Sequence, residues 1–255
     1  MVLAEQRALP PVVARMWGRE PASRHGPRPS LDLAKITAAA IEIADTQGLA
    51  GVRMSSVASH LGVATMSLYR YVGSKDELLT AMVDAATPEP PELGGQSWRD
   101  YLATWTRAIR DFRLDRPWLL LIAPRTPPTG PRSLRWLDRA LAALAHTGLD
   151  AGERINIATT LTGYAVSQAE LAHGMSSQHE TTGEAEIAGL TEYGEILAEV
   201  LDTESYPALS AVVHADGFGD AEEWIDDADF TFGLDLLLDG IEALIARRTP
   251  ASPAP

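Results

Sequence analysis

The residues with the most suggestive chemistry lie in the run TMSLYRY at positions 65–71. This run combines hydroxyl groups, two phenol rings and one guanidinium, which donate hydrogen bonds or present flat contact surfaces. Lys75 follows shortly after it. Side chains of these types contact phosphate oxygens and base edges in nucleic acids, so the run predicts a DNA-contacting surface. The alternative interpretation is the polar surface of an ordinary helix.

The elements that must position this run follow a helix-turn-helix pattern. Helical spacing predicts a first helix from Leu33 to Gly48, a short helix over 55–61 and another short helix over 65–71. Gly62 lies between the two short helices and suits a tight turn, because glycine adopts positive φ without strain. A helix carried in this way can enter the major groove of DNA, which is about 12 Å wide.

Apolar and polar positions separate along the helix over 65–71. Val63, Leu68 and Val72 are the apolar anchors expected on its inner side. The sequence SKDE at 74–77 then matches a capping box that opens a fourth helix, with Ser74 as the cap and Glu77 reaching back. Helix starts bind phosphate through free backbone N–H groups, and Lys75 lies beside this start. The outer side of the earlier helix offers Thr65, Met66, Ser67, Tyr69, Arg70 and Tyr71.

The rest of the chain is also predicted to be helical, so the fold class is all-α. Residues 87–95 are expected to form a linker, and residues 174–186 a polar loop. The further helices are expected over 97–114, 117–123, 131–147, 151–173, 184–203 and 228–247. The expected domains are a flexible basic arm over 1–30, a three-helix helix-turn-helix domain over 31–86, a larger helical domain over 97–247 and a disordered tail over 248–255.

Charge is distributed unevenly along the chain. Residues 1–86 hold nine Lys and Arg against eight Asp and Glu, a net charge of +1, and residues 87–255 hold 12 against 27, a net charge of -15. These values sum to the formal net charge of -14. We therefore expect contacts with a phosphate backbone in the first third of the chain. The five arginines of the arm either contact DNA or belong to a tail without a role.

Composition and motifs limit the other function classes. The chain has no cysteine, which excludes disulfides and cysteine nucleophiles and fits a reducing cytoplasm. No stretch is long and apolar enough to predict a membrane span. We find no GxSxG, P-loop, GxGxxG or HExxH motif. An uncharacterised enzyme and an acidic helical adaptor that binds only protein stay as alternatives, although the adaptor leaves TMSLYRY unexplained.

The segment from Lys35 to Met82 strongly resembles the DNA-binding domain of the TetR family of transcriptional repressors. The likeness rests on AxxIADTQGL, VASHLGV, SLYRYV and SKDELL, whose LGV…LYxYV…KxxLL spacing is specific. The segments that begin RPWLLL and FTFGLD are similar to the regulatory domain of the tetracycline-repressor-like branch. Together, the resemblance covers roughly residues 30–247.

This resemblance implies a homodimer in which each subunit offers one helix-turn-helix to half of a palindromic double-stranded DNA operator. It further implies that a small ligand in the C-terminal domain releases the DNA, and we expect a hydrophobic or aromatic ligand. Repression is the expected effect, with activation as the alternative. Arg70 is expected to read guanine or to contact a phosphate. The positions that match the family's DNA-contacting residues are Thr65, Met66, Ser67, Tyr69, Tyr71 and Lys75.

Two positions depart from the family pattern. Arg53 stands where many relatives have a Ser or Thr cap, so either Ser55 caps the helix or Arg53 reaches a phosphate. Met66 stands where several relatives have proline or a small residue, so the family's base preference is not carried over. The residues that bind magnesium-tetracycline are not matched. That ligand is therefore not inferred. Because the sequence shows no close-spaced pair of metal ligands and no catalytic motif, we expect no metal, no cofactor and no catalytic residues.

Aromatic residues of the larger domain are candidates for a ligand cavity, because such sites favour apolar linings. Ordinary core packing is the alternative for each of them. The resemblance assigns helices over 153–172 and 229–246 to a four-helix dimer interface, and the second of these carries an apolar stripe. The candidate ligand-binding residues are Trp105, Trp118, Trp136, Tyr164 and Gln168.

Overall fold

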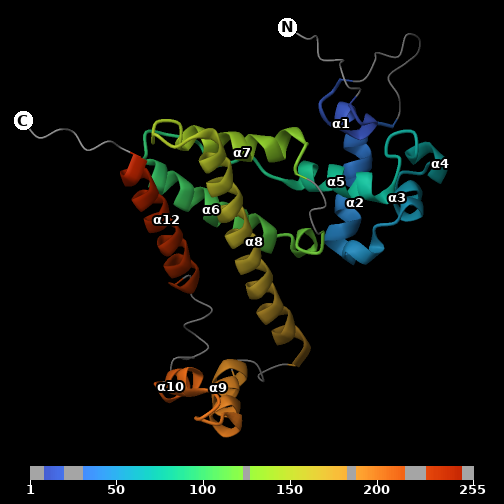
Figure 1. Ribbon diagram of the computed structural model, residues 1–255. Coiled ribbons are helices and arrows are strands. Elements are labelled where there is room, and N and C mark those ends of the chain that lie inside the picture. The colour runs from blue at the N-terminus through green and yellow to red at the C-terminus, as the bar shows by residue number, and fades with distance from the viewer. Residues whose placement is uncertain (1–8, 20–30, 123–126, 183–187, 216–227, 249–255) are drawn as a thin grey trace, which may run out of the picture. The chain divides into compact units, whose positions relative to one another are not determined.

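The computed structural model describes residues 9–19, 31–122, 127–182, 188–215 and 228–248 of the chain (Figure 1). Every regular element in these ranges is a helix, which confirms the predicted all-α class. The chain divides into two compact units, residues 1–146 and residues 147–255. The first unit therefore extends past the predicted helix-turn-helix domain and takes in two helices that we expected in the larger domain.

The first unit begins with five helices, which we call the N-terminal bundle: α1 (Pro11–Met16), α2 (Leu33–Gln47), α3 (Met54–His60), α4 (Thr65–Leu68) and α5 (Lys75–Ala86). α2 packs against both α3 and α5, and α3 packs against α4 (Figure 1). The helices α2 to α5 match those predicted from helical spacing. α4 is shorter than predicted, because the chain passes into turns after its fourth residue.

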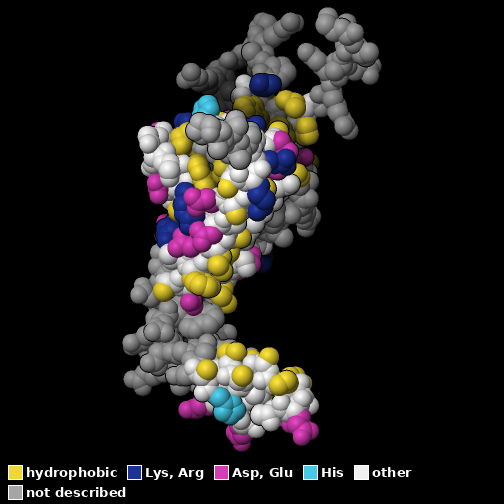
Figure 2. All heavy atoms as spheres, turned by 60° about the vertical axis from the view of Figure 1, so that its left-hand side comes forward, with side chains coloured by type: hydrophobic (Ala, Val, Ile, Leu, Met, Phe, Trp, Pro, Cys, Tyr) yellow, Lys and Arg dark blue, Asp and Glu magenta, His cyan; other side chains and the backbone are white. Residues whose placement is uncertain are grey.

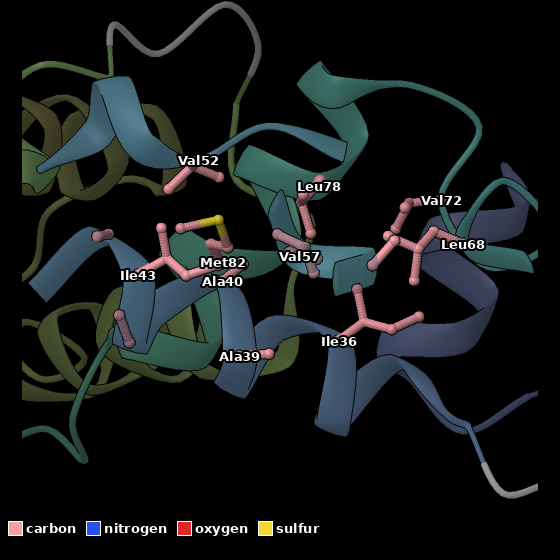
Figure 3. Packing of buried hydrophobic residues seen from close by; sticks show 14 of the residues in the cluster. Ile36, Ala39, Ala40, Ile43, Val52, Val57, Leu68, Val72, Leu78 and Met82 are labelled. Carbon is pink, nitrogen blue, oxygen red and sulfur yellow. The ribbon is translucent and has the colours of Figure 1, made fainter. Parts of the chain in front are cut away.

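One hydrophobic core joins the helices of the N-terminal bundle (Figure 3). Ile36, Leu68, Val72 and Leu78 are each 0% exposed in this core, which confirms two of the predicted anchors. The third, Val63, is only partly buried and packs at the edge. Truncating a fully buried leucine typically costs about 2–5 kcal/mol, so Leu68 alone holds α4 firmly to the bundle.

α1 corrects the prediction that residues 1–30 form a flexible arm. Residues 9–19 lie on the bundle, and Val12 is 5% exposed in the common core. The sequence carried a signal for this helix, because Pro11 suits the first helical position and the apolar Val12 and Met16 follow at helical spacing. The arginines of the stretch obscured it. The rest of the predicted arm lies outside the described residues.

Two longer helices complete the first unit. They are α6 (Trp98–Leu114) and α7 (Pro131–Ala143), and the short 3₁₀ turn η2 (Pro117–Leu119) lies between them. The prediction of a helix over 117–123 is therefore wrong in extent, because only a single turn forms there. α6 packs against both α7 and η2.

α5 and α7 are joined by a reciprocal set of hydrogen bonds, which we call the α5–α7 joint. The carboxylate of Asp84 is 6% exposed and accepts the backbone N–H groups of Ser133 at 2.8 Å and Arg132 at 3.4 Å. The Arg132 guanidinium donates to the carbonyls of Ala85 and Thr87 at 3.0 and 3.2 Å. A side chain of each helix therefore bonds backbone groups that have no helical partner at the end of the other helix.

A methyl group at position 130 is expected to disrupt the α5–α7 joint. Gly130 is buried directly before α7, and a Cβ atom there would lie 2.7 Å from the Asp84 Cβ, closer than packed carbon atoms approach. We expect Gly130→Ala to lower the free energy of unfolding by about 1–3 kcal/mol in urea titrations. Gly94→Ala is the matched control, because its added Cβ meets nothing within 4 Å. Equal stability of the two variants would contradict this role for the joint.

The second unit contains α8 (Ala151–Thr182), α9 (Ala188–Val200), α10 (Pro207–His214) and α12 (Ala228–Arg248). The polar loop predicted over 174–186 is wrong for its first part, because α8 continues through that stretch. α10 was not predicted, although Pro207 stands at its first turn, where proline is favoured. No helix in the described part of the chain is long and apolar enough to cross a membrane.

α8 and α12 pack along each other. The predicted apolar stripe of α12 supplies Leu234 and Leu238, which are each 1% exposed, and α8 supplies Leu161 at 0%. The Tyr164 hydroxyl donates to the Phe230 carbonyl at 2.8 Å, and the two rings lie 5.3 Å apart between centroids. Burial of these leucines shows that one face of α12 packs within its own unit.

A charged pair joins the start of α8 to the end of α12. The Arg248 guanidinium donates to the Glu153 carboxylate, with an Nε–Oε1 distance of 3.0 Å. The other carboxylate oxygen of Glu153 accepts the backbone N–H of Asp150 at 2.9 Å. The hydrogen bond from Asp150 and then the one from Arg248 lower the pKa of Glu153 below its ordinary value of 4.5.

The stability of the second unit should therefore depend on the protonation of Glu153. A carboxylate with a lowered pKa in the folded state stabilises the fold above its unfolded pKa of 4.5, and this contribution is lost as the pH falls through the folded value. We expect Glu153→Gln to lower the melting temperature near neutral pH, and the difference from wild type to shrink below pH 4.5. A difference that stays constant across this range would contradict the coupling.

α9 and α10 pack against each other and leave hydrophobic side chains exposed. Ile196, Val200, Tyr206 and Val212 are between 44% and 66% exposed. The lower part of Figure 2 shows hydrophobic side chains on this helix pair next to acidic ones. The pair therefore has little core of its own.

Candidate nucleic-acid interface

The turn between α3 and α4 is closed by a Schellman motif. Gly62 has a φ of 66°, a left-handed conformation that glycine adopts without strain. The N–H of Gly62 donates to the Ser59 carbonyl at 3.1 Å, and the N–H of Val63 donates to the Ala58 carbonyl at 3.0 Å. These two bonds end α3 and set the direction of α4. They confirm the turn that was predicted at Gly62.

α4 turns one face to the core and the other to solvent. Leu68 is fully buried, whereas Met66 is 73% exposed and Tyr69 is 43% exposed. Large apolar surfaces in this position can contact thymine methyl groups and sugars in a major groove. The other predicted contact residues of α4 and the turn after it are exposed or half-buried: Thr65, Ser67, Arg70 and Tyr71.

The start of α3 settles which residue occupies its cap. α3 begins at Met54, and Arg53 takes the N-cap position with extended backbone angles of φ -129° and ψ 149°. No side chain makes a capping hydrogen bond there, so the expectation that Ser55 takes over the cap is wrong. Arg53 and Ser55 are both exposed. A phosphate contact of Arg53 stays a prediction.

The start of α5 carries the predicted cap, with one difference in register. The Ser74 hydroxyl accepts the backbone N–H of Glu77 at 3.1 Å, as expected. The Glu77 carboxylate reaches back to the N–H of Gly73 at 2.7 Å, one residue before the cap. Lys75 is the first residue of α5 and is exposed.

Tyr71 lies at the edge of the N-terminal bundle rather than fully outside it. Its ring is half-buried against the hydrophobic core, and the guanidinium carbon of Arg15 lies 5.7 Å from the ring centroid. Sequence reasoning missed this partner, because Arg15 lies 56 residues earlier in a stretch that was expected to be flexible.

The chemistry of this surface suits a polyanion. Arg53, Arg70 and Lys75 are exposed cations on α3, the turn after α4, and α5. Each phosphate that such groups neutralise releases condensed counterions, which favours binding and makes it depend on salt. The hydroxyl, phenol and thioether groups of α4 add contacts that can distinguish bases.

Two of the candidate ligand-binding residues lie together in the first unit. Trp105 is 2% exposed, and its indole N–H donates to the Trp136 carbonyl at 3.0 Å. The two indole rings are 6.1 Å apart between centroids. Phe112 also packs against Trp136, with its ring centroid at 5.4 Å. These rings form an aromatic cluster between α6 and α7.

The other candidate ligand-binding residues lie elsewhere. Trp118 belongs to the hydrophobic core of the N-terminal bundle and donates its indole N–H to the Asp45 carboxylate at 2.6 Å. Its burial in this core favours the alternative of ordinary core packing for Trp118. Tyr164 and Gln168 are half-buried on α8 in the second unit. Among the described residues, no group of three or more acidic or histidine side chains could hold a metal ion.

Two family descriptions match the chain in successive segments. Residues 36–82 match "Bacterial regulatory proteins, tetR family". Residues 89–245 match "Tetracyclin repressor-like, C-terminal domain". The first segment covers α2 to most of α5 and includes the turn at Gly62.

Proteins with similar sequences are regulators of transcription. The chain is 34% identical over 238 residues to the HTH-type transcriptional repressor DrrR1 of Streptomyces coeruleorubidus, covering 91% of this chain and 85% of that protein. It is 30% identical over 230 residues to an HTH-type transcriptional regulator of Saccharopolyspora erythraea, covering 89% and 91%. The crystal structure of ActR from Streptomyces coelicolor in complex with actinorhodin is similar with a TM-score of 0.68 and 26% identity, covering 84% of this chain and 98% of that one.

Proposed function

The chain belongs to the TetR family of bacterial regulatory proteins, and from this membership we propose that it is a homodimeric repressor that binds a palindromic operator and is released by a small ligand. Membership identifies it as a DNA-binding regulator of transcription and excludes the enzyme and adaptor alternatives. A repressor of bacterial genes works in the cytoplasm, where the DNA is. The remaining parts of the proposal concern the operator, the dimer and the ligand.

The observation that carries the DNA-binding proposal is the exposed face of α4. Met66 and Tyr69 lie outward while Leu68 anchors the same helix in the core, so the helix projects side chains without losing its position. In the proposed complex, Met66, Tyr69 and Arg70 contact base edges or phosphates in the major groove. The proposed flanking contacts, mainly to phosphates, come from Arg53, Ser55, Thr65, Ser67, Tyr71 and Lys75.

The homodimer is proposed from faces of α8 and α12 on which hydrophobic side chains are left exposed in a single chain. On α12, Phe232 is 68% exposed and Leu236 is 58% exposed, and both lie away from the buried stripe. On α8, Ile155 is 48% exposed, and a Cβ added to Gly163, about two turns later, would meet no atom within 4 Å. A second copy of these faces would remove their apolar surface from water.

A ligand that releases the DNA is proposed from the aromatic cluster of Trp105, Trp136 and Phe112 and from the actinorhodin complex of the similar protein ActR. Aromatic linings favour hydrophobic or aromatic ligands. The α5–α7 joint supports such control, because it connects the helix that ends the DNA-binding segment to a helix of the cluster. Thermal shift and operator release with a panel of aromatic compounds, actinorhodin included, test this part. If no compound shifts the melting temperature or releases the operator, the proposed control by a ligand is wrong.

The operator itself is tested by selecting genomic fragments that the purified protein retains and then mapping the bound site by footprinting. We expect a protected palindrome with two half-sites about one helical turn, 34–36 Å, apart. Recovery of unrelated fragments with no shared sequence would contradict operator recognition. The genes beside the recovered site would identify what the repressor controls.

A further inference from the structure

α1 is fixed within the first unit by three separate contacts. Val12 enters the hydrophobic core and is 5% exposed. The Arg15 guanidinium donates to the Tyr71 carbonyl at 2.6 Å and also lies over the Tyr71 ring. The indole N–H of Trp17 donates to the carbonyl of Thr129, in the turn before α7, at 2.8 Å. α1 is therefore a structural part of the DNA-binding unit.

The contact with Tyr71 falls where the recognition helix ends. α4 has only four residues, and the N–H groups of Tyr71 and Val72 both donate to the Leu68 carbonyl, at 2.8 and 3.0 Å. The carbonyls that follow have no helical partner of their own, because the helix does not continue. Arg15 supplies a charged donor to one of them, and charge-assisted hydrogen bonds are stronger and shorter than neutral ones. A cation near the end of a helix is also favoured by its dipole.

We propose that Arg15 is a positioning residue for operator recognition: it holds the end of α4 and the Tyr71 ring in the orientation that lets the exposed face of α4 enter the groove. This inference rests on the proposed DNA-binding function. Leu68 and Val72 fix the two ends of the exposed stretch 69–71 in the core, and the hydrogen bond from Arg15 adds a fixed point at the Tyr71 carbonyl between them, which limits movement of this stretch. Arg15 thus acts through Tyr71 rather than through a contact of its own with DNA.

The alternative role for Arg15 is a simple phosphate contact, and the chain offers a matched control. Arg19 lies in the same segment and carries the same charge, but its guanidinium carbon lies 5.8 Å from the ring centroid of Trp17 instead of contacting α4. Arg15→Gln and Arg19→Gln therefore remove equal charge from neighbouring positions. Only the first change removes the support from the recognition helix. Arg15→Lys keeps one donor and the charge, so it should restore part of any decrease in affinity.

The experiment measures binding to a selected operator duplex and to a scrambled duplex over a series of KCl concentrations. We expect Arg15→Gln to bind the operator about tenfold more weakly, with little change for the scrambled duplex and an unchanged salt slope. Arg19→Gln should leave the ratio of the two affinities unchanged. The proposal is overturned if Arg15→Gln weakens both duplexes equally and reduces the salt slope by about 0.9 for each phosphate that is no longer neutralised. It is also overturned if Arg15→Gln matches wild type.

Hydrogen exchange of the free protein provides a readout that does not need DNA. Arg15→Gln should speed exchange of the backbone amides in residues 68–72 and leave those of α6 unchanged, and Arg15→Lys should restore part of the protection. Unchanged exchange in residues 68–72 would overturn the positioning role. Failure of the wild-type chain to bind any duplex would instead remove the proposed function, so the two failures are distinguishable.

Discussion

Replacing Leu236 with aspartate is expected to convert the proposed homodimer to a monomer and to weaken operator binding by about 100-fold or more, because two linked half-site contacts bind far more tightly than one. Leu236 is 58% exposed and lies one turn after Phe232, which is 68% exposed. Both side chains face away from Leu234 and Leu238, which are buried within the unit. The fold of the single chain should therefore tolerate the change.

The dimer should dissociate because the substitution would bury an unpaired charge in its interface. In a two-fold interface the same patch contributes from both subunits, so each new aspartate would replace apolar contact area with a buried charge next to the aspartates already present on α12. Val200→Asp is the matched control, since Val200 is 66% exposed on α9 and receives the same charge. Sedimentation and operator titration measure both effects. A dimer that persists in Leu236→Asp with unchanged operator affinity would contradict the proposed interface.

Tyr69→Ala is expected to reduce operator affinity by about 10- to 100-fold while leaving stability nearly unchanged. Tyr69 is 43% exposed on the outward face of the α4 turn and is not part of the hydrophobic core. Its removal should therefore weaken the interaction with DNA rather than packing within the protein. A phenol ring in this position provides both a hydrogen bond and a flat apolar surface, which alanine lacks.

The measurement compares fluorescence anisotropy of labelled operator with thermal unfolding of each variant. Tyr206→Ala is the control, because Tyr206 is 55% exposed in the second unit and has no proposed role at the DNA. We expect Tyr206→Ala to bind the operator like wild type. If Tyr69→Ala keeps its fold and binds the operator like wild type, Tyr69 does not contribute to DNA binding.

Features that depend on neighbouring residues could be predicted from the sequence. The glycine at 62 and the SKDE stretch are local signals, since the bonds of the turn and the cap join residues within five positions of each other. The same holds for the spacing of Leu68 and Val72, which placed α4 against the core. These local signals were enough to predict the helix-turn-helix and the burial of one face of α4.

Features that depend on distant pairs could not be predicted in this way. Arg15 and Tyr71 are 56 residues apart, and Asp84 accepts a hydrogen bond from a residue 48 positions later. Trp118 donates to Asp45 across 73 positions, so no spacing rule separates this core residue from a cavity residue. An aspartate on a helix and an arginine in a basic stretch give no local sign of their partners.

The extent of α8 was mispredicted for a different reason. The stretch GMSSQHETT is polar and begins with glycine, which favours a loop when judged by propensity. Propensity is a weak guide, and a helix that is already formed can extend through polar residues because each added residue gains a hydrogen bond at little further cost. The helix therefore continues to Thr182.

The measurement that tests the central claim most directly is the affinity of the full chain for its selected operator duplex as KCl is raised. Although the chain carries a net charge of -14, the exposed cations around α4 predict sequence-selective binding whose logarithm falls linearly with the logarithm of salt, with a slope of about -0.9 for each phosphate contacted. A scrambled duplex should bind far more weakly at every salt concentration. Equal affinity for both duplexes, or an affinity that does not change with salt, would contradict the assignment of α4 as a DNA-recognition helix.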